Sequence, residues 1–281
     1  MTDLREYKKD VYSQCGEDGI LERVLNIIGD NNQWCVEFGA WDAQYMSNTF
    51  NLIKNKGYSA ILIEADKHKF KDLVKNTRSY PNVTPINAYV GWDGEQKLDE
   101  MLKRTSIPID FDLLSIDVDG NDYHIWNAVK EYRPKVVVIE FNQTIPSHLE
   151  FVQKAHKSVN IGSSIRSIYN LGKQKNYELV CTTDFNAIFV EQRYYKLFQI
   201  EDNDPETLIK NSRYHTYLFQ GLNGQIFLAG CKTLLWHNIP FAESKIQQIP
   251  KCFRYHPKNF SFIKKVLFKL YSELRKNVFK Q

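Results

Sequence analysis

Polar side chains that carry carboxylate or amide oxygens stand two residues apart at two places where an apolar run of the sequence ends. Asp117 and Asp119 follow the run LLSI, and Glu140 and Asn142 follow the run KVVVI. In an extended chain, residues two apart point to the same face, so each pair presents both side chains together. Carboxylate and amide oxygens are ligands that Mg²⁺ and Mn²⁺ prefer, and carboxylates that converge without a cation or a proton repel one another. The pattern predicts a divalent-metal site made by these four residues.

A second interpretation of the same residues needs no metal. Asp117 would contact the positively charged amine of a cofactor, while Asp119 and Glu140 would hold a substrate or remove its proton. A neutral hydroxyl is a weak nucleophile that needs help from a base or a metal. Both interpretations therefore give these carboxylates a role in a reaction, and the sequence leaves the two open.

Histidine has the ordinary pKa closest to neutral pH and is the most natural general base. His124 lies at the start of a helical stretch shortly after Asp119, and its position alone makes it the first candidate. His148 and His237 are rivals, although any single histidine is more often a surface or packing residue. The proton acceptor is therefore expected to be His124 or one of the carboxylates.

Apolar runs that alternate with helical patterns must position these residues. Runs that are nearly all apolar are typical of strands covered on both faces, and the helices between them favour parallel crossovers. Strands are predicted at 33–38, 59–64, 83–87, 112–118 and 135–141. Helices are predicted at 17–28, 67–77, 94–104, 123–132 and 163–175.

Two further strands, 177–183 and 187–191, are separated by Asp184, Phe185 and Asn186. Asp and Asn favour a tight turn, so these strands should form a hairpin. The whole pattern predicts an α/β fold with a Rossmann-like, seven-stranded and mostly parallel sheet that has an antiparallel strand near its edge.

The residues at the strand ends favour S-adenosylmethionine over a dinucleotide cofactor. In open α/β sheets ligands bind beyond the carboxyl ends of the strands, and a pyrophosphate there needs a loop with several glycines. The loop after the first strand has only Gly39. S-adenosylmethionine has no phosphate and needs one glycine for close approach, with acidic groups for its amine and its ribose. Glu37 and Asp42 could contact the amine, and Glu64 could accept hydrogen bonds from the ribose hydroxyls.

Five sequence boxes in order resemble those of the FkbM-type methyltransferases. They are YSQCGED at 12–18, VEFGAWDAQYMSNT at 36–49, GYSAILIEAD at 57–66, NAYVG at 87–91 and LLSIDVDGNDYHIW at 113–126. The resemblance covers about residues 11–192. It departs from the family at Ala43, where glycine is common and the turn after Asp42 could change, and at Asp119, where glutamate is common.

The resemblance implies a class I methyltransferase fold in which Gln14, Asn48 and Ala88 join the cofactor site. Its subgroup resembles methyltransferases of bacterial surface-polysaccharide gene sets, which implies a sugar or a sugar-linked glycan precursor as the acceptor. Related sugar O-methyltransferases depend on a metal held by carboxylates after the fourth and fifth strands. Their ligand pattern is not reproduced box for box in this sequence.

Charge is unevenly distributed along the chain. Residues 251–281 hold nine Lys or Arg and the single acidic residue Glu273, which leaves 28 basic and 32 acidic residues before them. A mildly acidic main body argues against a nucleic-acid substrate. We expect two parts, a cofactor-binding domain at 1–192 and an extension at 193–281 that makes substrate or oligomer contacts and contains a hairpin around Asn223-Gly224.

The extension is predicted to end in a basic amphipathic helix. Its apolar face would carry Ile263, Val266, Leu267, Leu270, Leu274 and Val278, with Lys264, Lys265, Lys269, Arg275, Lys276 and Lys280 largely opposite. Such a helix docks on the protein or a partner subunit, or lies on an anionic membrane surface. Because the sequence shows no apolar run long enough to span a bilayer and no apolar signal-peptide core, we expect a cytoplasmic protein, free or membrane-associated.

These features together predict an S-adenosylmethionine-dependent O-methyltransferase acting on a sugar-like acceptor, with Mg²⁺ or Mn²⁺ as a candidate second cofactor. The alternatives are an N-methyltransferase or small-molecule methyltransferase of the same fold, and a non-catalytic binding module. An N/D-P-P-Y/F box, expected for methylation of nucleic-acid bases, is absent from the sequence. The intact acidic residues at the strand ends argue against a non-catalytic module.

Overall fold

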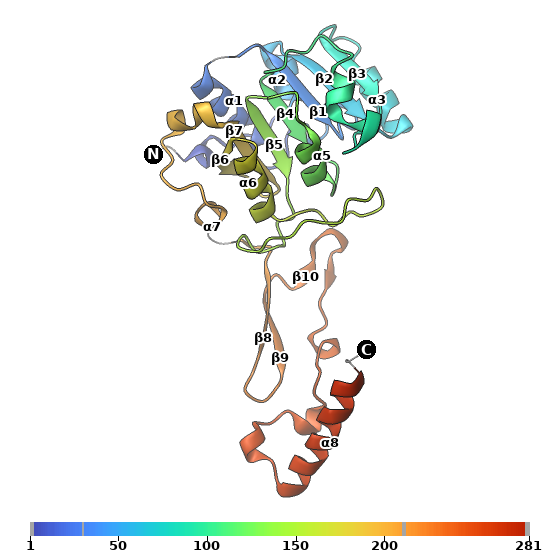
Figure 1. Ribbon diagram of the computed structural model, residues 1–281, viewed down its shortest axis with the longest axis vertical. Helices are drawn as coiled ribbons and strands as arrows, with labels where there is room; N and C mark the ends of the chain where they lie inside the picture. Colours follow the sequence, from blue (N-terminus) through green and yellow to red (C-terminus); the bar gives the residue numbers. More distant parts are fainter. Residues whose placement is uncertain (1–2, 30, 210–211, 279–281) are drawn as a thin grey trace. The chain divides into compact units, whose positions relative to one another are not determined.

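A computed structural model describes residues 3–29, 31–209 and 212–278 of the chain. It divides into two compact units, Met1–Asn211 and Ser212–Gln281. Figure 1 labels the helices and strands of both units. The first unit contains every predicted site residue except His237, and it continues beyond residue 192 to include η3 (Gln192–Phe198) and α7 (Pro205–Leu208).

The first unit is built on a seven-stranded sheet with the order β3-β2-β1-β4-β5-β7-β6. Neighbouring strands from β3 to β5 are parallel, and β7 runs antiparallel to both β5 and β6. The predicted fold class and hairpin are therefore confirmed. The strands are β1 (Trp34–Phe38), β2 (Ser59–Glu64), β3 (Val83–Asn87), β4 (Leu113–Ile116), β5 (Val136–Glu140), β6 (Tyr177–Thr182) and β7 (Asn186–Glu191).

Helices cover both faces of this sheet (Figure 1). They are η1 (Leu4–Tyr7), α1 (Glu17–Ile28), α2 (Phe50–Lys56), α3 (Lys67–Thr77), η2 (Gly94–Gln96), α4 (Leu98–Leu102), α5 (Asp122–Ala128) and α6 (Ile165–Gln174). The predicted bounds of α1 and α3 are confirmed. Helix α2 was not predicted, because seven residues are too few to show a helical period, and α4 and α5 are shorter than the sequence predicted.

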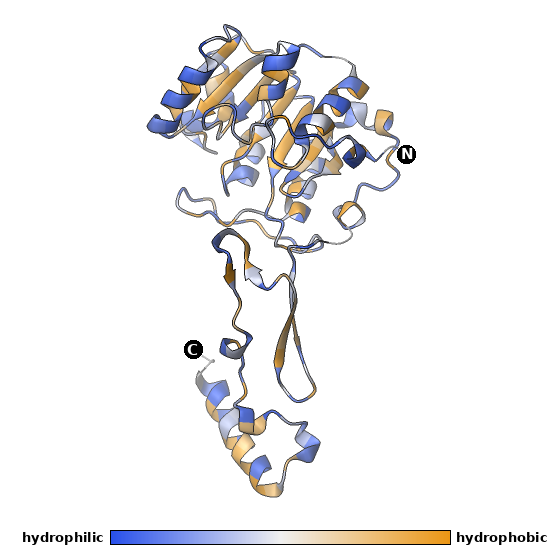
Figure 2. Cartoon of the chain, turned by 180° about the vertical axis from the view of Figure 1, so that it is seen from behind, coloured by the Kyte–Doolittle hydropathy of each residue, from blue (hydrophilic) through white to orange (hydrophobic). Residues whose placement is uncertain are grey.

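Because successive side chains of each strand point to opposite faces, the sheet has an apolar layer on each side. Figure 2 shows the strands largely in orange and the helices in both orange and blue. In β1, Cys35 packs with α1 and α2, whereas its neighbour Val36 packs with α4, α5 and α6 on the opposite face. Successive strand residues point to opposite faces, so a sheet covered on both sides needs a continuous apolar run. The parallel strands then present their carboxyl ends at one edge, where the predicted site residues lie.

The second unit consists of two small hairpins, short 3-10 turns and one long helix. The hairpin predicted around Asn223-Gly224 is confirmed, since β8 and β9 pair antiparallel across it and Gly224 takes a φ of +76°. Its elements are β8 (Thr216–Gln220), β9 (Ile226–Gly230), β10 (Thr233–Leu234), η4 (Leu235–His237), β11 (Ile239–Pro240), η5 (Glu243–Lys245), η6 (Lys251–Phe253), η7 (Pro257–Asn259) and α8 (Phe262–Val278).

Candidate functional site

The turn after β4 is fixed by a carboxylate that the sequence analysis did not assign. Asp122, in the first turn of α5, accepts hydrogen bonds from the backbone N–H groups of Val118 (2.9 Å) and Gly120 (2.8 Å). These bonds hold Asp119 at a φ of +55°, a left-handed conformation that costs a non-glycine residue about 1 kcal/mol or more. Burial raises the pKa of Asp122 to about 6. The strained turn places Asp119 beside the end of β4.

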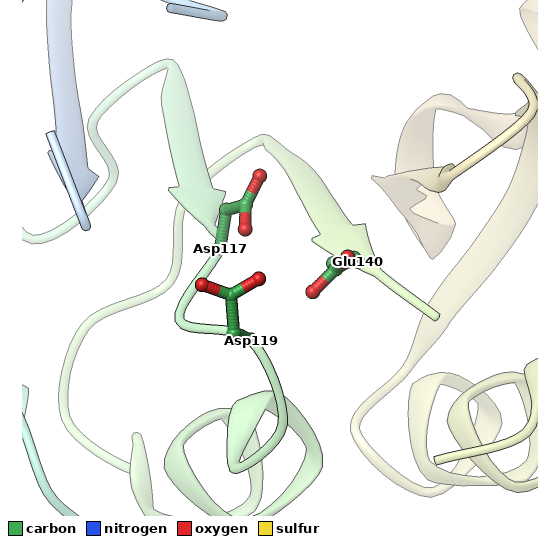
Figure 3. Close-up of side chains that lie close together, drawn as sticks. All are labelled: Asp117, Asp119 and Glu140. Carbon is green, nitrogen blue, oxygen red and sulfur yellow. The ribbon is translucent and has the colours of Figure 1, made fainter. Parts of the chain in front are cut away.

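Three predicted site carboxylates converge at the carboxyl edge of the sheet. Oxygens of Asp117, Asp119 and Glu140 lie within 4.8 Å of one another. Figure 3 shows the first two on the turn after β4 and the third at the end of β5, all directed toward one space. Asp117 and Glu140 are partly buried and Asp119 is exposed. The expected meeting of these strand ends is therefore present in the structure, and we call these three residues the acidic cluster.

The acidic cluster lacks a positive partner within the described part of the chain. No described residue donates a hydrogen bond to these carboxylates or forms an ion pair with them. Burial raises the pKa of Asp117 well above its usual range, and the neighbouring carboxylates of Asp122 and Asp119 raise it further. The pKa of Glu140 is raised by burial and then by Asp117. Such a cluster needs a proton or a cationic ligand, because like charges at this distance repel.

Asn142 is occupied by its own loop. Its side-chain oxygen accepts hydrogen bonds from the backbone N–H (2.9 Å) and the hydroxyl (2.6 Å) of Thr144, and its amide donates to the carbonyl of Ile161 (2.7 Å). An amide oxygen has two lone pairs, and both are used here. In this conformation Asn142 shapes the segment after β5, and the acidic cluster alone offers free oxygens to a metal.

His124, the predicted base, has a fixed tautomer. Its Nε2 lies 2.7 Å from the carbonyl oxygen of Gln153, and a carbonyl can only accept, so Nε2 carries the hydrogen. In the neutral ring Nδ1 is then the nitrogen able to take a proton. The ring packs 6.0 Å from Trp92 and 5.5 Å from Tyr123, measured between ring centroids. The rival His148 is exposed, and His237 lies in the second unit.

Gln153 ties the segment after β5 to the turn after β4, a role that no sequence pattern indicated. Its buried amide donates to Asn121 (3.0 Å) and to the carbonyl of Val159 (2.8 Å), and its oxygen accepts from the N–H groups of Ile161 and Gly162 (both 2.8 Å). The segment 151–162 therefore forms a wall beside the acidic cluster. Nearby in sequence, the buried amide of Gln143 has no partner among the described residues.

The loop after β1 is organised by Glu37. This buried carboxylate accepts hydrogen bonds from the hydroxyls of Ser47 and Thr49 (both 2.6 Å) and from the backbone N–H of Asn48 (2.9 Å). Burial raises its pKa, and these bonds lower it in part. Asn48 in turn donates to the hydroxyl of Ser115 on β4 (3.0 Å). Both predicted cofactor residues thus hold the loop after β1 in place, and Glu37 has about one lone pair left for a ligand.

Gly39 lets the ends of β1 and β4 meet. It has a φ of +74°, and a Cβ at this position would lie 1.9 Å from the backbone oxygen of Asp117. The close approach that the sequence analysis assigned to a cofactor is therefore made first by the protein itself. Asp42, the second predicted amine contact, accepts from the N–H groups of Gln44 (2.9 Å) and Tyr45 (2.8 Å) and so caps its own loop.

Ala43, in the turn after Asp42, adopts a φ of +73°. Trp41 and Met46 in the same loop also have left-handed conformations, with φ of +45° and +57°. A left-handed conformation at a non-glycine residue adds backbone strain to this loop. Several strained residues in one loop are a feature of ligand-binding sites.

Glu64 lies at the end of β2 and is almost completely buried. One carboxylate oxygen accepts from the N–H of Trp41 (2.9 Å) and the other from the N–H of Asp66 (2.7 Å), which leaves each oxygen a lone pair. The N–H of Ala88 bonds the backbone oxygen of Glu64 (3.2 Å), so the loops after β1, β2 and β3 meet here. Gln14 is exposed near the start of α1.

These residues fit S-adenosylmethionine on two observations. Glu64 keeps paired acceptors suited to a ribose diol, and Asp117 is a partly buried carboxylate with no donor among the described residues, suited to an ammonium group. No group in this edge of the sheet requires a phosphate. The arrangement agrees with the predicted cofactor.

No protein-family model matches the chain, and no curated protein is significantly similar to it. Solved structures with a similar fold include a putative O-methyltransferase from Klebsiella pneumoniae (13% identity, 67% of this chain and 86% of that chain, TM-score 0.42). TrmK from M. capricolum in complex with S-adenosyl-homocysteine is 12% identical over 60% of this chain and 66% of that chain, with a TM-score of 0.35. The glycopeptide N-methyltransferase MtfA, complexed with S-adenosyl-L-methionine, is 10% identical over 64% of this chain and 89% of that chain, with a TM-score of 0.36.

At these identities and TM-scores, the assignment of the fold rests on the strand order itself. The sequence predicted a Rossmann-like, seven-stranded and mostly parallel sheet with an antiparallel strand near its edge, and the observed order β3-β2-β1-β4-β5-β7-β6 with an antiparallel β7 agrees with that prediction. The first unit of the chain has the Rossmann-like fold of class I methyltransferases.

Proposed function

We propose that this protein is an S-adenosylmethionine-dependent O-methyltransferase whose acceptor is a sugar or a sugar-linked precursor of a surface glycan. The observation that carries the proposal is the acidic cluster, which lies at the carboxyl edge of the sheet between the ends of β4 and β5. The resemblance of the sequence boxes to FkbM-type methyltransferases supplies the class of acceptor.

The electrostatics of the acidic cluster favour a neutral acceptor rich in hydroxyl groups. Three carboxylates within 4.8 Å repel an anionic acceptor, while each of their oxygens can accept a hydrogen bond from a hydroxyl. Sugar hydroxyls are neutral donors with little tendency to ionise. The cluster would orient one hydroxyl by two or more charge-assisted hydrogen bonds and exclude others by geometry.

S-adenosylmethionine, when bound, supplies an electrophilic methyl group on a sulfonium. The acceptor oxygen forms the new carbon–oxygen bond while the carbon–sulfur bond breaks, and the hydroxyl proton must leave. Glu140 is suited to receive that proton, since burial and the charge of Asp117 raise its pKa and make its carboxylate a stronger proton acceptor. His124 could take the proton only through Nδ1, because Nε2 already donates to Gln153.

The metal-assisted form of this proposal places Mg²⁺ or Mn²⁺ on Asp117, Asp119 and Glu140. Carboxylate oxygens are suitable ligands for these hard cations. A divalent ion there would neutralise the cluster and lower the pKa of a bound hydroxyl. In the metal-free form, a proton and the cofactor amine relieve the same repulsion.

Calorimetric titration with S-adenosylhomocysteine tests the cofactor. The wild-type protein should bind it, and Glu64→Ala should bind more weakly by about 1.5 to 3 kcal/mol, the range for hydrogen bonds to a charged group. Glu95→Ala, which removes a glutamate whose side chain is 90% exposed, is the matched control and should bind like wild type. Equal binding by a folded Glu64→Ala protein would show that the ribose pocket lies elsewhere.

Titration with Mn²⁺ alone separates the two forms of the site. In the metal-assisted form the wild-type protein binds one Mn²⁺, Glu140→Gln binds it at least about tenfold more weakly, and EDTA leaves S-adenosylhomocysteine affinity largely unchanged. Absence of Mn²⁺ binding, together with no metal by elemental analysis, would remove the metal and leave the cofactor pocket as proposed.

A further inference from the structure

Among the described residues, the long helix α8 packs through one of its sides. Phe268 and Tyr271 on this helix contact the rings of Phe253 and Phe260, with centroids 5.3 to 5.9 Å apart. The Tyr271 hydroxyl also donates to the backbone oxygen of Gln248. These aromatic contacts fix α8 within the second unit and determine which side of the helix stays uncovered.

The uncovered side is a continuous apolar stripe. Its residues follow helical spacing and are between 46% and 70% exposed: Ile263, Val266, Leu267, Leu270 and Leu274. The sequence pattern also assigns Val278 to this stripe, but its side chain and Lys280 lie outside the part that the structure describes. Aligned apolar residues on a soluble surface usually mark a contact site, because leaving them in water is unfavourable. Figure 2 shows hydrophobic and hydrophilic residues alternating along α8.

Most of the charged residues on the remaining sides of α8 are basic. By helical spacing Lys264 and Arg275 lie toward one edge of the stripe and Lys269 toward the other, while Lys265 and Lys276 lie largely opposite the stripe. Long basic side chains can bury their carbon chains beside an apolar surface and extend the charged group to its edge. An apolar stripe on an otherwise basic helix is typical of helices that lie in the headgroup region of an anionic bilayer.

A second copy of the chain is a poorer occupant of the stripe. Two copies of α8 packed stripe to stripe would bring together two helices that are both strongly basic, and the one acidic residue of this helix, Glu273, already pairs with Lys276 at 2.9 Å. Anionic headgroups match the basic charge of the helix without this repulsion. No helix in the described part of the chain is long and apolar enough to cross a membrane, so contact would be with the surface.

We propose that α8 binds the protein to anionic membrane surfaces by inserting the stripe Ile263–Leu274 among lipid headgroups while its lysines contact lipid phosphates. This inference does not depend on the proposed enzyme activity. It places the second unit of the chain at a lipid surface.

Sedimentation of the full-length protein with vesicles tests the proposal. The protein should sediment with vesicles of phosphatidylcholine mixed with phosphatidylglycerol, and much less with phosphatidylcholine alone. Leu270→Ser/Leu274→Ser should weaken binding at least about tenfold, since two exposed leucines lose their burial in lipid. Lys265→Glu/Lys269→Glu should remove the preference for phosphatidylglycerol and its dependence on salt. The matched control is Leu218→Ser on β8, which is exposed in the same unit and should bind like wild type.

Three results would overturn the proposal: no sedimentation of the wild-type protein with either vesicle, binding that the leucine variant retains, and self-association that the leucine variant abolishes without any vesicle binding. The last would assign the stripe to a second copy. Binding of S-adenosylhomocysteine by the variants shows that the first unit remains folded.

Discussion

The charged residues at the two ends of strands β4 and β5 differ in whether they have a partner of opposite charge. At their amino ends Asp112 and Lys135 form an ion pair at 2.9 Å in which both side chains are almost completely buried. Asp112 also accepts hydrogen bonds from the N–H groups of Asn32 (3.0 Å) and Gln33 (2.7 Å). At their carboxyl ends the acidic cluster has no positive partner in the described part of the protein.

This difference indicates that the amino ends of β4 and β5 stabilise the fold and that their carboxyl ends are suited to bind a ligand. A buried charge with a partner and several hydrogen bonds is complete within the protein, and removing one partner is costly. Carboxylates gathered without a partner lower stability, and they persist in active sites where a ligand uses them. The amino end should therefore respond to mutation with lost stability, and the carboxyl end with lost function.

The largest effect is expected from Lys135→Met. It leaves the buried charge of Asp112 without its cation and should lower the free energy of unfolding by about 3 to 5 kcal/mol. Urea denaturation of the purified protein measures this. The matched control is Lys103→Met, which removes ion pairs with Glu100 and Glu131 from a side chain that is 42% exposed and should cost far less stability than Lys135→Met. An equal loss of unfolding free energy in the two variants would contradict the proposed structural role of the buried ion pair at the amino ends of β4 and β5.

The second largest effect is expected in the pH dependence of the free energy of unfolding, through the carboxyl groups near the carboxyl ends of β4 and β5. Asp122, with a pKa of about 6, and the raised carboxyl groups of Asp117 and Glu140 bind protons in the folded state that the unfolded chain has already released. The contribution of Asp122 is fully present below about pH 4 and is lost as the pH rises through about 6, and in EDTA it should fall by on the order of 2 kcal/mol between pH 4 and 7. The contributions of Asp117 and Glu140, whose pKa values are also raised, are lost in the same direction as the pH rises.

The readout of this second prediction is the difference between wild type and Asp117→Asn/Glu140→Gln in urea denaturation at several pH values. The comparison is needed because carboxylates with lowered pKa, such as Asp204 beside Arg166, change stability in the opposite direction. With rising pH, the free energy of unfolding of the variant should decline less steeply than that of wild type. A decline as steep as that of wild type would mean that the acidic cluster is already neutralised by groups within the protein.

The smallest effect on stability is expected from Glu140→Gln alone. Replacing one carboxylate by an amide removes repulsion from Asp117 and Asp119, so the unliganded protein should be unchanged or more stable by up to about 1 kcal/mol. Thermal unfolding without ligand measures this change. Added Mn²⁺ should stabilise wild type and not the variant if the metal-assisted form is correct. A loss of 3 kcal/mol or more, roughly the cost of breaking a buried pair, would instead place Glu140 among the structural residues.

The sequence by itself determined the strands and most helices of the first unit, and the edge of the sheet where the candidate site lies. Strand bounds such as Ser59–Glu64 and helix bounds such as Lys67–Thr77 were predicted correctly, because apolar periodicity and capping residues like Asp66 are local signals. The prediction that Asp117, Asp119 and Glu140 would meet also followed from local patterns, since parallel strands end at one edge.

Only the tertiary structure decided how the other predicted residues are used. Glu37 bonds Ser47 and Thr49, and His124 donates to Gln153, because loops far apart in sequence close on one another when the sheet forms. The pairing of Asp112 with Lys135 likewise depends on the register between β4 and β5. A hydrogen bond or ion pair between distant residues leaves no period or spacing in the sequence, since its partners are set by strand register and by the packing of loops against the sheet.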